Sequence, residues 1–281
     1  MNKWLKPTVF ALVVVVVLGA AAFFGWTRLA RYVAFPEAVA VAERAERVRG
    51  WYVFAPERAP VAGFVFYPGG LVDPVAYAPL MQRLADGGVL AVIVPMPLDL
   101  AVLGIGRAAE VIATFPQVDS WVIAGHSLGG AMASEFVKRN PESVVGLALL
   151  ASYPAASTDL SDLPIRAVST YGSENGLTPP EGFEASLERL PPGTELVVIE
   201  GGNHAGFGHY GPQAGDGIAS IDREEQQRQT AETVLSFVRA LATGLSDDGD
   251  EAEPVPIASA APTAARTPPV PSGPLRPPPR E

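Results

Sequence analysis

A serine between two glycines is the first feature of this sequence that could do chemistry. It stands in the order Gly125-His126-Ser127-Leu128-Gly129. The apolar stretch 120–125 comes directly before it and an amphipathic stretch over 128–140 follows, which predicts a strand, a sharp turn and a helix. Such a turn pushes the serine hydroxyl out of the sheet edge, and the glycines let the backbone approach it. We therefore expect Ser127 to be a nucleophile; the alternative is a strand-to-helix turn without chemistry.

A serine hydroxyl needs a base to take its proton, and only a few histidines are available. His204 lies in the glycine-rich stretch 201–211, just beyond an apolar strand at 195–201. Functional groups collect on loops at the carboxyl ends of parallel strands, so His204 is the expected general base. His209, later in the same stretch, is expected to be a loop or rim residue, and His126 to shape the pocket.

The imidazole in turn needs an acceptor for its other ring N–H. The expected place is the loop at 172–176, which follows the strand predicted at 165–172. Glu174 is favoured because a developing imidazolium gains more from a full charge than from a dipole. Asn175 could instead hold the ring through its amide oxygen. A third possibility is that Asp159 or Asp162, after the preceding strand, supplies the group.

Acyl transfer also needs donors for the negative charge that develops on the carbonyl oxygen. One is expected to be the backbone N–H of Leu128, the residue after the nucleophile. The other is expected from Gly70 or Leu71, because Pro68-Gly69-Gly70 follows an early strand. A plain tight turn is the alternative interpretation of those glycines.

These residues require a parallel sheet to bring them to one edge. Apolar stretches separated by amphipathic ones predict an α/β fold, with a mostly parallel central sheet covered by helices on both faces. Strands are predicted at 47–56, 62–68, 89–95, 120–125, 144–152, 165–172 and 195–201, and helices at 77–88, 106–115, 128–140, 181–190 and 223–241. The short stretch 153–164 leaves no room for a large lid, which suits small soluble acyl substrates.

The two ends differ from this centre, and we predict a division into 1–30, 31–245 and 246–281. Residues 8–26 form an uninterrupted apolar run long enough to span a bilayer, which predicts a single-pass anchor with the amino terminus inside. A cleaved signal peptide is the alternative, so the protein would be either membrane-bound or secreted. Residues 246–281 are acidic and then rich in proline and alanine, which predicts a disordered tail.

Composition excludes several classes of partner and site. The net charge of -10 offers no basic stripe for nucleic acid. The absence of cysteine excludes disulfides, thiolate nucleophiles and cysteine-based metal sites. With only three histidines we expect no metal and no cofactor. The oligomeric state does not follow from the sequence.

The motifs together resemble a known family. The stretches FYPGGLVDPVAYAPL, VIVPMPLDLA, GHSLGG, YGSENGLTPP and GGNHAGFGHYGPQAGDG are similar to those of a compact bacterial group of α/β hydrolases, related in pattern to dienelactone-hydrolase-like enzymes. The resemblance covers 48–240 and implies the α/β-hydrolase fold, Ser127 and His204 as the catalytic pair, and cleavage of an ester or related acyl bond. Asn175 departs from it, since the family pattern has Asp there. Dienelactone hydrolases proper use a cysteine nucleophile, so their substrate is not carried over.

The sequence therefore predicts a membrane-anchored, extracytoplasmic serine hydrolase that acts on a small acyl substrate through an acyl-enzyme. Two alternatives stay open: a catalytically silent binding protein on the same fold, and an acyltransferase acting on envelope components.

Overall fold

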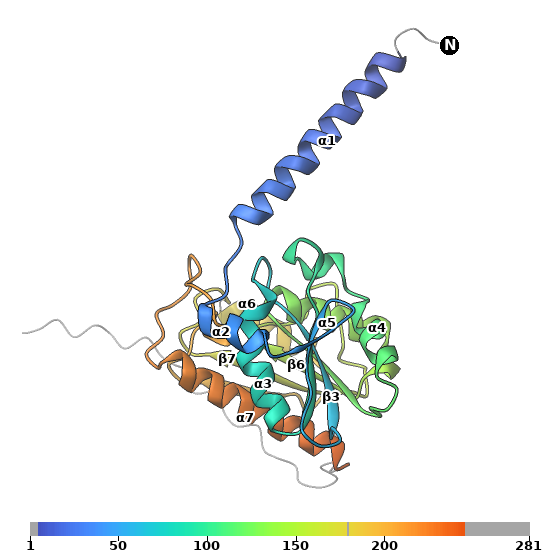
Figure 1. The fold of residues 1–281 in the computed structure, drawn as a ribbon. Helices are drawn as coiled ribbons and strands as arrows, with labels where there is room; N and C mark the ends of the chain where they lie inside the picture. Colours follow the sequence, from blue (N-terminus) through green and yellow to red (C-terminus); the bar gives the residue numbers. More distant parts are fainter. Residues whose placement is uncertain (1–4, 179, 245–281) are drawn as a thin grey trace, which may run out of the picture. The chain divides into compact units, whose positions relative to one another are not determined.

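The computed structural model of this chain describes residues 5–178 and 180–244 (Figure 1). The predicted tail at 246–281 lies outside the described residues. Among those described, eight strands form one sheet in the order β1-β2-β4-β3-β5-β6-β7-β8. From β4 to β8 every neighbouring pair is parallel, whereas β2 runs antiparallel to both β1 and β4. The strands are β1 (Glu46–Val48), β2 (Trp51–Phe54), β3 (Ala62–Tyr67), β4 (Val89–Ile93), β5 (Trp121–His126), β6 (Gly146–Leu150), β7 (Arg166–Gly172) and β8 (Glu195–Ile199).

Helices cover both faces of this sheet, which confirms the predicted α/β class. Helices α2, α3 and α7 contribute to the core cluster on one face, and α4 and α5 to the cluster on the other. Their bounds are α1 (Leu5–Leu29), α2 (Pro36–Ala42), α3 (Ala78–Asp86), α4 (Arg107–Thr114), α5 (Leu128–Arg139), α6 (Pro180–Leu187) and α7 (Arg223–Ala242). Short 3₁₀ turns lie at η1 (Pro74–Tyr77), η2 (Pro97–Asp99), η3 (Ala101–Leu103), η4 (Pro141–Ser143) and η5 (Ala205–Phe207).

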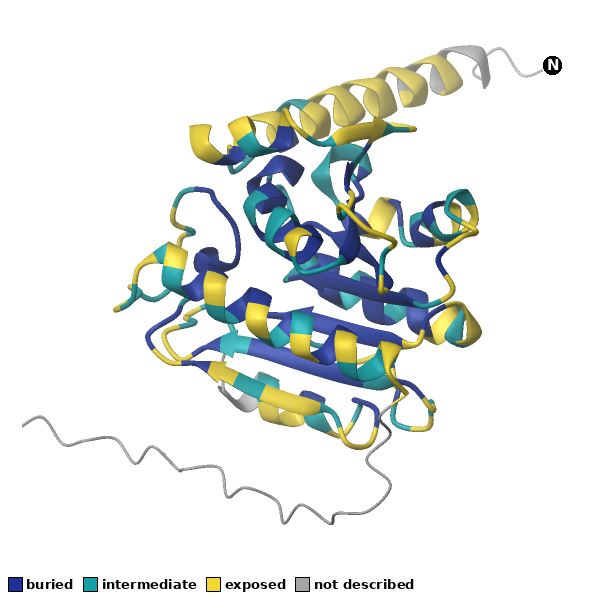
Figure 2. Ribbon diagram, turned by 60° about the horizontal axis from the view of Figure 1, so that its bottom comes forward, coloured by how far each residue is buried: buried dark blue, intermediate teal, exposed yellow. Residues whose placement is uncertain are grey.

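The central strands are buried on both faces because each contributes to two cores (Figure 2). In β3, Phe64 and Phe66 point into one cluster, whereas Val65 and Tyr67 point into the other. This is the period-two alternation of a strand. A run without a polar face is thus what a doubly covered parallel strand requires, and it is the reason that the sequence reads as continuously apolar there.

Two elements at the amino-terminal side differ from the predicted ones. The single strand expected at 47–56 is a hairpin, since Arg49 and Gly50 both have positive φ and turn the chain between β1 and β2. Two adjacent residues with positive φ form the tight turn that matches the twist of a hairpin. The short helix α2, with Pro36 at its first position, was not predicted; only Ala38 and Ala42 of its residues are buried, which leaves little signal in the sequence.

The apolar helix at the amino terminus extends from Leu5 to Leu29. Its stretch Leu12–Leu29 has a mean hydropathy of 2.0 and is long enough to cross a bilayer. Most of its large apolar side chains are exposed, as Figure 2 shows by colour. Length and composition therefore fit a membrane span, and they equally fit a signal sequence.

Candidate active site

Ser127 occupies the sharp turn between β5 and α5. Its φ of 52° and ψ of -123° lie outside the regions that residues with a Cβ normally adopt. The turn is held by hydrogen bonds from Ser127 N to Leu150 O (3.1 Å) and from Ser152 Oγ to Ser127 O (2.6 Å). Ser127 itself is partly exposed, whereas His126 before it is fully buried. The strained backbone thus presents this serine at the surface of the sheet edge.

Two glycines make this turn possible because the backbone passes close to itself. A Cβ on Gly125 would lie 2.3 Å from the carbonyl carbon of Gly129. A Cβ on Gly129 would lie 2.1 Å from the carbonyl oxygen of Tyr67, at the end of β3. Neither position can hold a side chain without movement of backbone atoms, so both glycines of the sequence pattern have a steric reason.

Backbone strain is concentrated at the same edge of the sheet. Among the described residues, six that are not glycine have positive φ: Arg49, Leu71, Leu98, Asp99, Ser127 and Ala151. All but Arg49 lie just beyond the carboxyl ends of β3, β4, β5 or β6. Strain of this kind costs on the order of 1–3 kcal/mol per residue and persists where the surroundings enforce it, commonly at functional sites.

His204 lies in the loop between β8 and η5 and is only 3% exposed. Its ring centroid is 4.6 Å from that of His126, the residue beside Ser127. Burial lowers the pKa of His204 to about 4, against a smaller opposing effect of the Asp216 charge. Neither ring nitrogen of His204 has a hydrogen-bond partner among the described residues. At neutral pH the ring is therefore neutral, and both nitrogens are buried without a bond to Ser127 or to any other described group.

Asp216 holds the His204 loop in place and was missed in the sequence. Its carboxylate accepts hydrogen bonds from the backbone N–H of His204 (3.1 Å) and of Ala205 (2.8 Å). It also accepts one from the N–H of Gly176, at 3.3 Å, in the loop after β7. Asp216 thus joins the loop of the candidate base to the loop of the candidate acid. The only sequence signal is its position between two glycines, Gly215 and Gly217, in the motif that carries His204.

A second buried link connects His126 with the loop after β3. The Tyr77 hydroxyl accepts a hydrogen bond from Gly69 N (3.0 Å) and lies 2.8 Å from Nδ1 of His126. The carbonyl oxygen of His204, which faces Nε2, can only accept, so the one proton of the neutral His126 ring is on Nε2 and the Tyr77 hydroxyl donates to Nδ1. Nε2 lies 3.1 Å from the carbonyl oxygen of His204. Burial lowers the pKa of His126 far below its usual value, in agreement with a neutral ring. His126 therefore shapes the site through hydrogen bonds rather than by packing alone.

The predicted oxyanion donors differ in whether their backbone N–H groups are already hydrogen-bonded. Leu71 N–H already donates to the carbonyl oxygen of Asp99 at 2.8 Å. Within the described part of the chain, neither Gly70 N–H nor Leu128 N–H has an acceptor. A Cβ on Gly70 would lie 3.1 Å from the Leu128 side chain, so these two residues are adjacent. Gly70 and Leu128 are therefore better placed to supply donors than Leu71.

None of the candidate acids is hydrogen-bonded to the His204 ring. Asn175 is engaged locally, since its amide oxygen accepts from Leu177 N and its amide nitrogen donates to Thr178. Glu174 is exposed, and its carboxylate has no hydrogen bond or ion pair with any described residue. Asp159 accepts hydrogen bonds from Ser161 and is exposed, as is Asp162.

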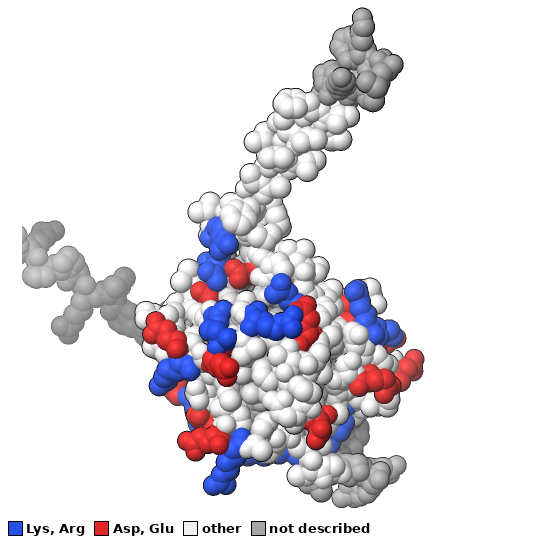
Figure 3. Space-filling model, turned by 45° about the vertical axis from the view of Figure 1, so that its right-hand side comes forward, with Lys and Arg blue, Asp and Glu red and all other residues white. Residues whose placement is uncertain are grey.

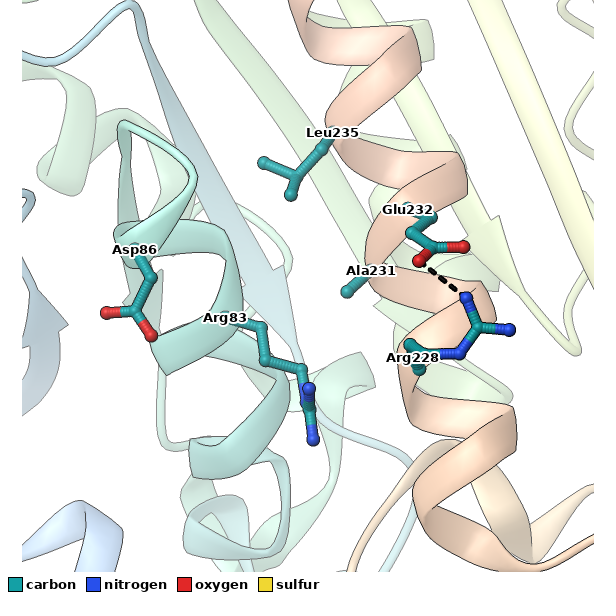
Figure 4. Close-up of a pocket in the computed structure, with 6 residues that line it drawn as sticks. All are labelled: Arg83, Asp86, Arg228, Ala231, Glu232 and Leu235. Carbon is teal, nitrogen blue, oxygen red and sulfur yellow. Dashed lines mark hydrogen bonds and ion pairs between the residues drawn. The ribbon is translucent and has the colours of Figure 1, made fainter.

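Other features do not belong to this site. His209 is buried; its ring lies 3.6 Å from a Glu37 carboxylate oxygen, and its backbone pairs with Phe35 and Ala76. A hollow between α3 and α7 is lined by Arg83, Asp86, Arg228, Ala231, Glu232 and Leu235 (Figure 4). It lies towards the amino ends of the strands, because Leu235 packs on Gly87 just before β4. Within residues 5–178 and 180–244, no group of three or more acidic or histidine side chains could hold a metal ion.

Comparison with known proteins identifies the family to which this architecture belongs. The family model described as "Alpha/beta hydrolase family" matches residues 63–228, which is more than half of the chain. The chain belongs to the alpha/beta hydrolase family. The match includes the elbow at Ser127 and the loop of His204. No curated protein matches the sequence.

Solved structures of low sequence identity have the same fold. One is the hydrolase MGS-MChE2 from the sediment metagenome of the lagoon of Mar Chica, Morocco, with 16% identity and a TM-score of 0.52, which covers 70% of this chain and 98% of that one. TT1662 from Thermus thermophilus has 17% identity and a TM-score of 0.52, with 71% and 98% covered. Est1E from Butyrivibrio proteoclasticus, solved with ferulic acid bound, has 13% identity and a TM-score of 0.50, with 68% and 97% covered. These likenesses establish the hydrolase fold.

Proposed function

We propose that this protein is a serine hydrolase that cleaves an ester or related acyl bond. One observation carries the proposal: a strained turn presents the partly exposed Ser127, and its neighbour His126 contacts His204, a neutral histidine with unpaired ring nitrogens. A serine on a strained turn and a neutral imidazole at the same sheet edge are the two groups that activation of a hydroxyl requires. Ser127 is then the nucleophile and His204 the general base.

The reaction proceeds in two steps. Ser127 Oγ attacks the acyl carbonyl carbon while His204 takes the hydroxyl proton, and Leu128 N–H and Gly70 N–H hold the oxyanion. His204 gives the proton to the leaving alcohol, which departs and leaves an acyl-enzyme. Water then attacks this ester with His204 as base, and the carboxylic acid leaves as Ser127 regains its proton.

Glu174 is the proposed acceptor for the second ring nitrogen of His204. Its carboxylate has no competing partner among the described residues, whereas the Asn175 amide is already used in its own loop. A carboxylate also stabilises the imidazolium that forms during attack more strongly than an amide does. Asp216 supports His204 indirectly: its carboxylate binds the backbone of the His204 loop, and its negative charge favours the protonated ring.

The location proposed for this hydrolase is outside the cytoplasm, at the membrane. The apolar stretch Leu12–Leu29 supports an anchor, and the continuation of this stretch through Phe23 and Phe24 favours an anchor over a cleaved signal. Lys3 and Lys6 before the apolar run at 8–26 are balanced by Arg28 and Arg31 after it, so the flanking charge is the same on both sides.

Turnover of a soluble short-chain ester by the full-length protein tests the activity. We expect release of the acid and the alcohol by the wild type and none above background by Ser127→Ala. A silent binding protein would give no turnover by either. Addition of an alcohol acceptor separates the transferase alternative, since a transferase forms the new ester in preference to the free acid.

A further inference from the structure

The segment that follows α1 is fixed onto the loops around the candidate site. Arg31 forms ion pairs with Asp73 (3.2 Å) and with Asp99 (2.8 Å). Tyr32 N donates to Leu71 O at 2.8 Å, and Asp73 N donates to Tyr32 O at 2.9 Å. Both partners of Arg31 are mostly buried, so these contacts are not loose surface pairs. We call Arg31 and Tyr32, with these partners, the dock.

The dock contacts the turns at 69–73 and 97–99, the first of which carries the proposed oxyanion donor Gly70. We call these two turns the oxyanion wall. Leu71, to which Tyr32 is bonded, directly follows Gly70, and Gly70 lies against Leu128. Leu71 N also donates to Asp99 O, so the turns at 69–73 and 97–99 are joined beneath Arg31. Leu71 and Asp99 both have positive φ, which the dock helps to enforce.

The dock limits the distance between the candidate site and the carboxyl end of α1. Helix α1 ends at Leu29, two residues before Arg31. Two residues span at most about 7 Å even when fully extended. Whatever direction the helix takes, the oxyanion wall therefore stays close to its carboxyl end. If α1 lies in a bilayer, the candidate site is held at the surface of that bilayer.

Exposed apolar side chains lie on the segments next to the dock. Leu29 and Val33, on either side of the dock, are 91% and 66% exposed. Val102 and Leu103 in η3 are each 51% exposed, and η3 packs against both η2 and α5. Large apolar side chains fit an apolar interface better than water. Figure 3 shows that the surface of α1 carries no charged side chain over most of its length, and Arg28 and Arg31 follow at its carboxyl end, between the apolar run and Val33.

We propose that the site acts on acyl esters of membrane lipids, which it reaches from the bilayer surface. This inference rests on the proposed serine hydrolase activity and names its substrate class. It replaces the soluble substrate that the short segment between β6 and β7 suggests, because the dock and the apolar side chains around it place a lipid phase beside the oxyanion wall. A lid is unnecessary where the membrane itself covers the site.

A longer tether tests the proposal without a change in the site. Ten Gly/Ser residues are inserted between Ala30 and Arg31, so that α1 and the dock are both kept. The matched control carries the same insertion after Gly193, an exposed turn before β8 with open space around it. Both proteins and the wild type are reconstituted at full length in phosphatidylcholine–phosphatidylglycerol vesicles. Each is treated with a soluble fluorophosphonate and, separately, with a long-chain alkyl fluorophosphonate that partitions into the bilayer.

The longer tether is expected to lower the rate of labelling by the bilayer-partitioned probe about fivefold or more, because the site samples a larger volume. Labelling by the soluble probe should stay unchanged, and the Gly193 insertion should affect neither rate. Equal labelling of all three proteins by the lipid probe would overturn the membrane-lipid inference while the hydrolase stands. Absence of Ser127-dependent labelling by the soluble probe would overturn the hydrolase itself.

Discussion

The turn that carries Ser127 and the loop that carries Glu174 both follow buried parallel strands at one edge of the sheet, but they are constrained in different ways. At the first, backbone atoms contact backbone atoms, and Gly125 and Gly129 leave no room for any other residue. At the second, the backbone is tied to Gly202 and to Asp216, while the Glu174 side chain is exposed and unpaired. The proposed nucleophile is thus positioned by main-chain sterics, whereas the proposed acid is an exposed side chain without a fixed partner among the described residues.

The largest effect is expected at His204, the proposed base that would act between Ser127 and Glu174. Replacement by Gln should lower kcat for ester hydrolysis about 1,000-fold or more, since the nucleophile loses its base. The fold should be kept, because the ring makes no hydrogen bond with described residues. Steady-state kinetics with a circular dichroism control measures this, and His209→Gln is the matched variant. Equal losses in both variants would contradict the assignment of His204 as base.

Asp216→Asn is expected to have the next largest effect, a fall in kcat of about tenfold to 100-fold. The variant loses the charge that supports protonated His204 and weakens the bonds to the backbone of His204 and Ala205. Because the Asp216 charge raises the pKa of His204, the acid limb of the kcat/KM profile should also move to lower pH. Asp162→Asn, an exposed change on another loop, is the control. An unchanged pH profile would remove Asp216 from this role.

The acid loop itself can be tested by exchanging its two candidates. Glu174→Gln should lower kcat about tenfold and leave KM unchanged, since the carboxylate is needed only when His204 is charged. Asn175→Ala should change kcat less than twofold. Adding Asn175→Asp to the Glu174→Gln variant should restore part of the rate, because the carboxylate returns one residue along the loop. The opposite ranking of the two single variants would assign the ring acceptor to Asn175.

The buried link through Tyr77 predicts a smaller effect on the rate. Tyr77→Phe removes the hydroxyl between Gly69 and His126, so the loop with the oxyanion donor loosens and kcat should fall about fivefold to tenfold. Tyr67→Phe is a matched control: its hydroxyl is also bonded, to Ile105 O at 2.5 Å and from Ala108 N at 2.8 Å, but away from the site. Tyr67→Phe should destabilise the fold without a change in kcat at saturation. Equal effects of both variants on kcat would mean that the Tyr77 link is structural only.

As the pH is lowered from neutral, the stability of the fold is expected to fall before the folded His204 becomes protonated. The pKa of His204 is about 4 when folded and 6.5 when unfolded, so the unfolded chain binds a proton first as pH falls below 6.5. Unfolding is therefore favoured by roughly 2–3 kcal/mol between pH 6.5 and 4, with no further change below 4. Chemical unfolding of the wild type and of His204→Gln at pH 7 and 4.5 isolates this share. The free energy of unfolding should fall more between pH 7 and pH 4.5 in the wild type than in His204→Gln. An equal fall in the two proteins would contradict the low pKa of His204.

The placement of Ser127 and His204 at the carboxyl ends of two strands could be predicted from local sequence. Ser127 and His204 follow strands that are mainly apolar, and the parallel sheet brings such strand ends to one edge. The choice between Gly70 and Leu71 could not be made, because it depends on whether the carbonyl of Asp99 occupies one N–H. Asp216 was missed because it acts through backbone N–H groups twelve residues earlier, a relation with no fixed spacing. The dock at Arg31 was missed for a similar reason: it joins segments that are far apart in the chain.

The rate at which a soluble fluorophosphonate labels Ser127 tests the central claim most directly, since it needs no knowledge of the substrate. We predict that mass spectrometry finds the label on Ser127, at a rate that falls about 100-fold or more in His204→Gln and is unchanged in His209→Gln. Labelling of Ser127 at the wild-type rate in His204→Gln would contradict the pairing of this serine with this histidine.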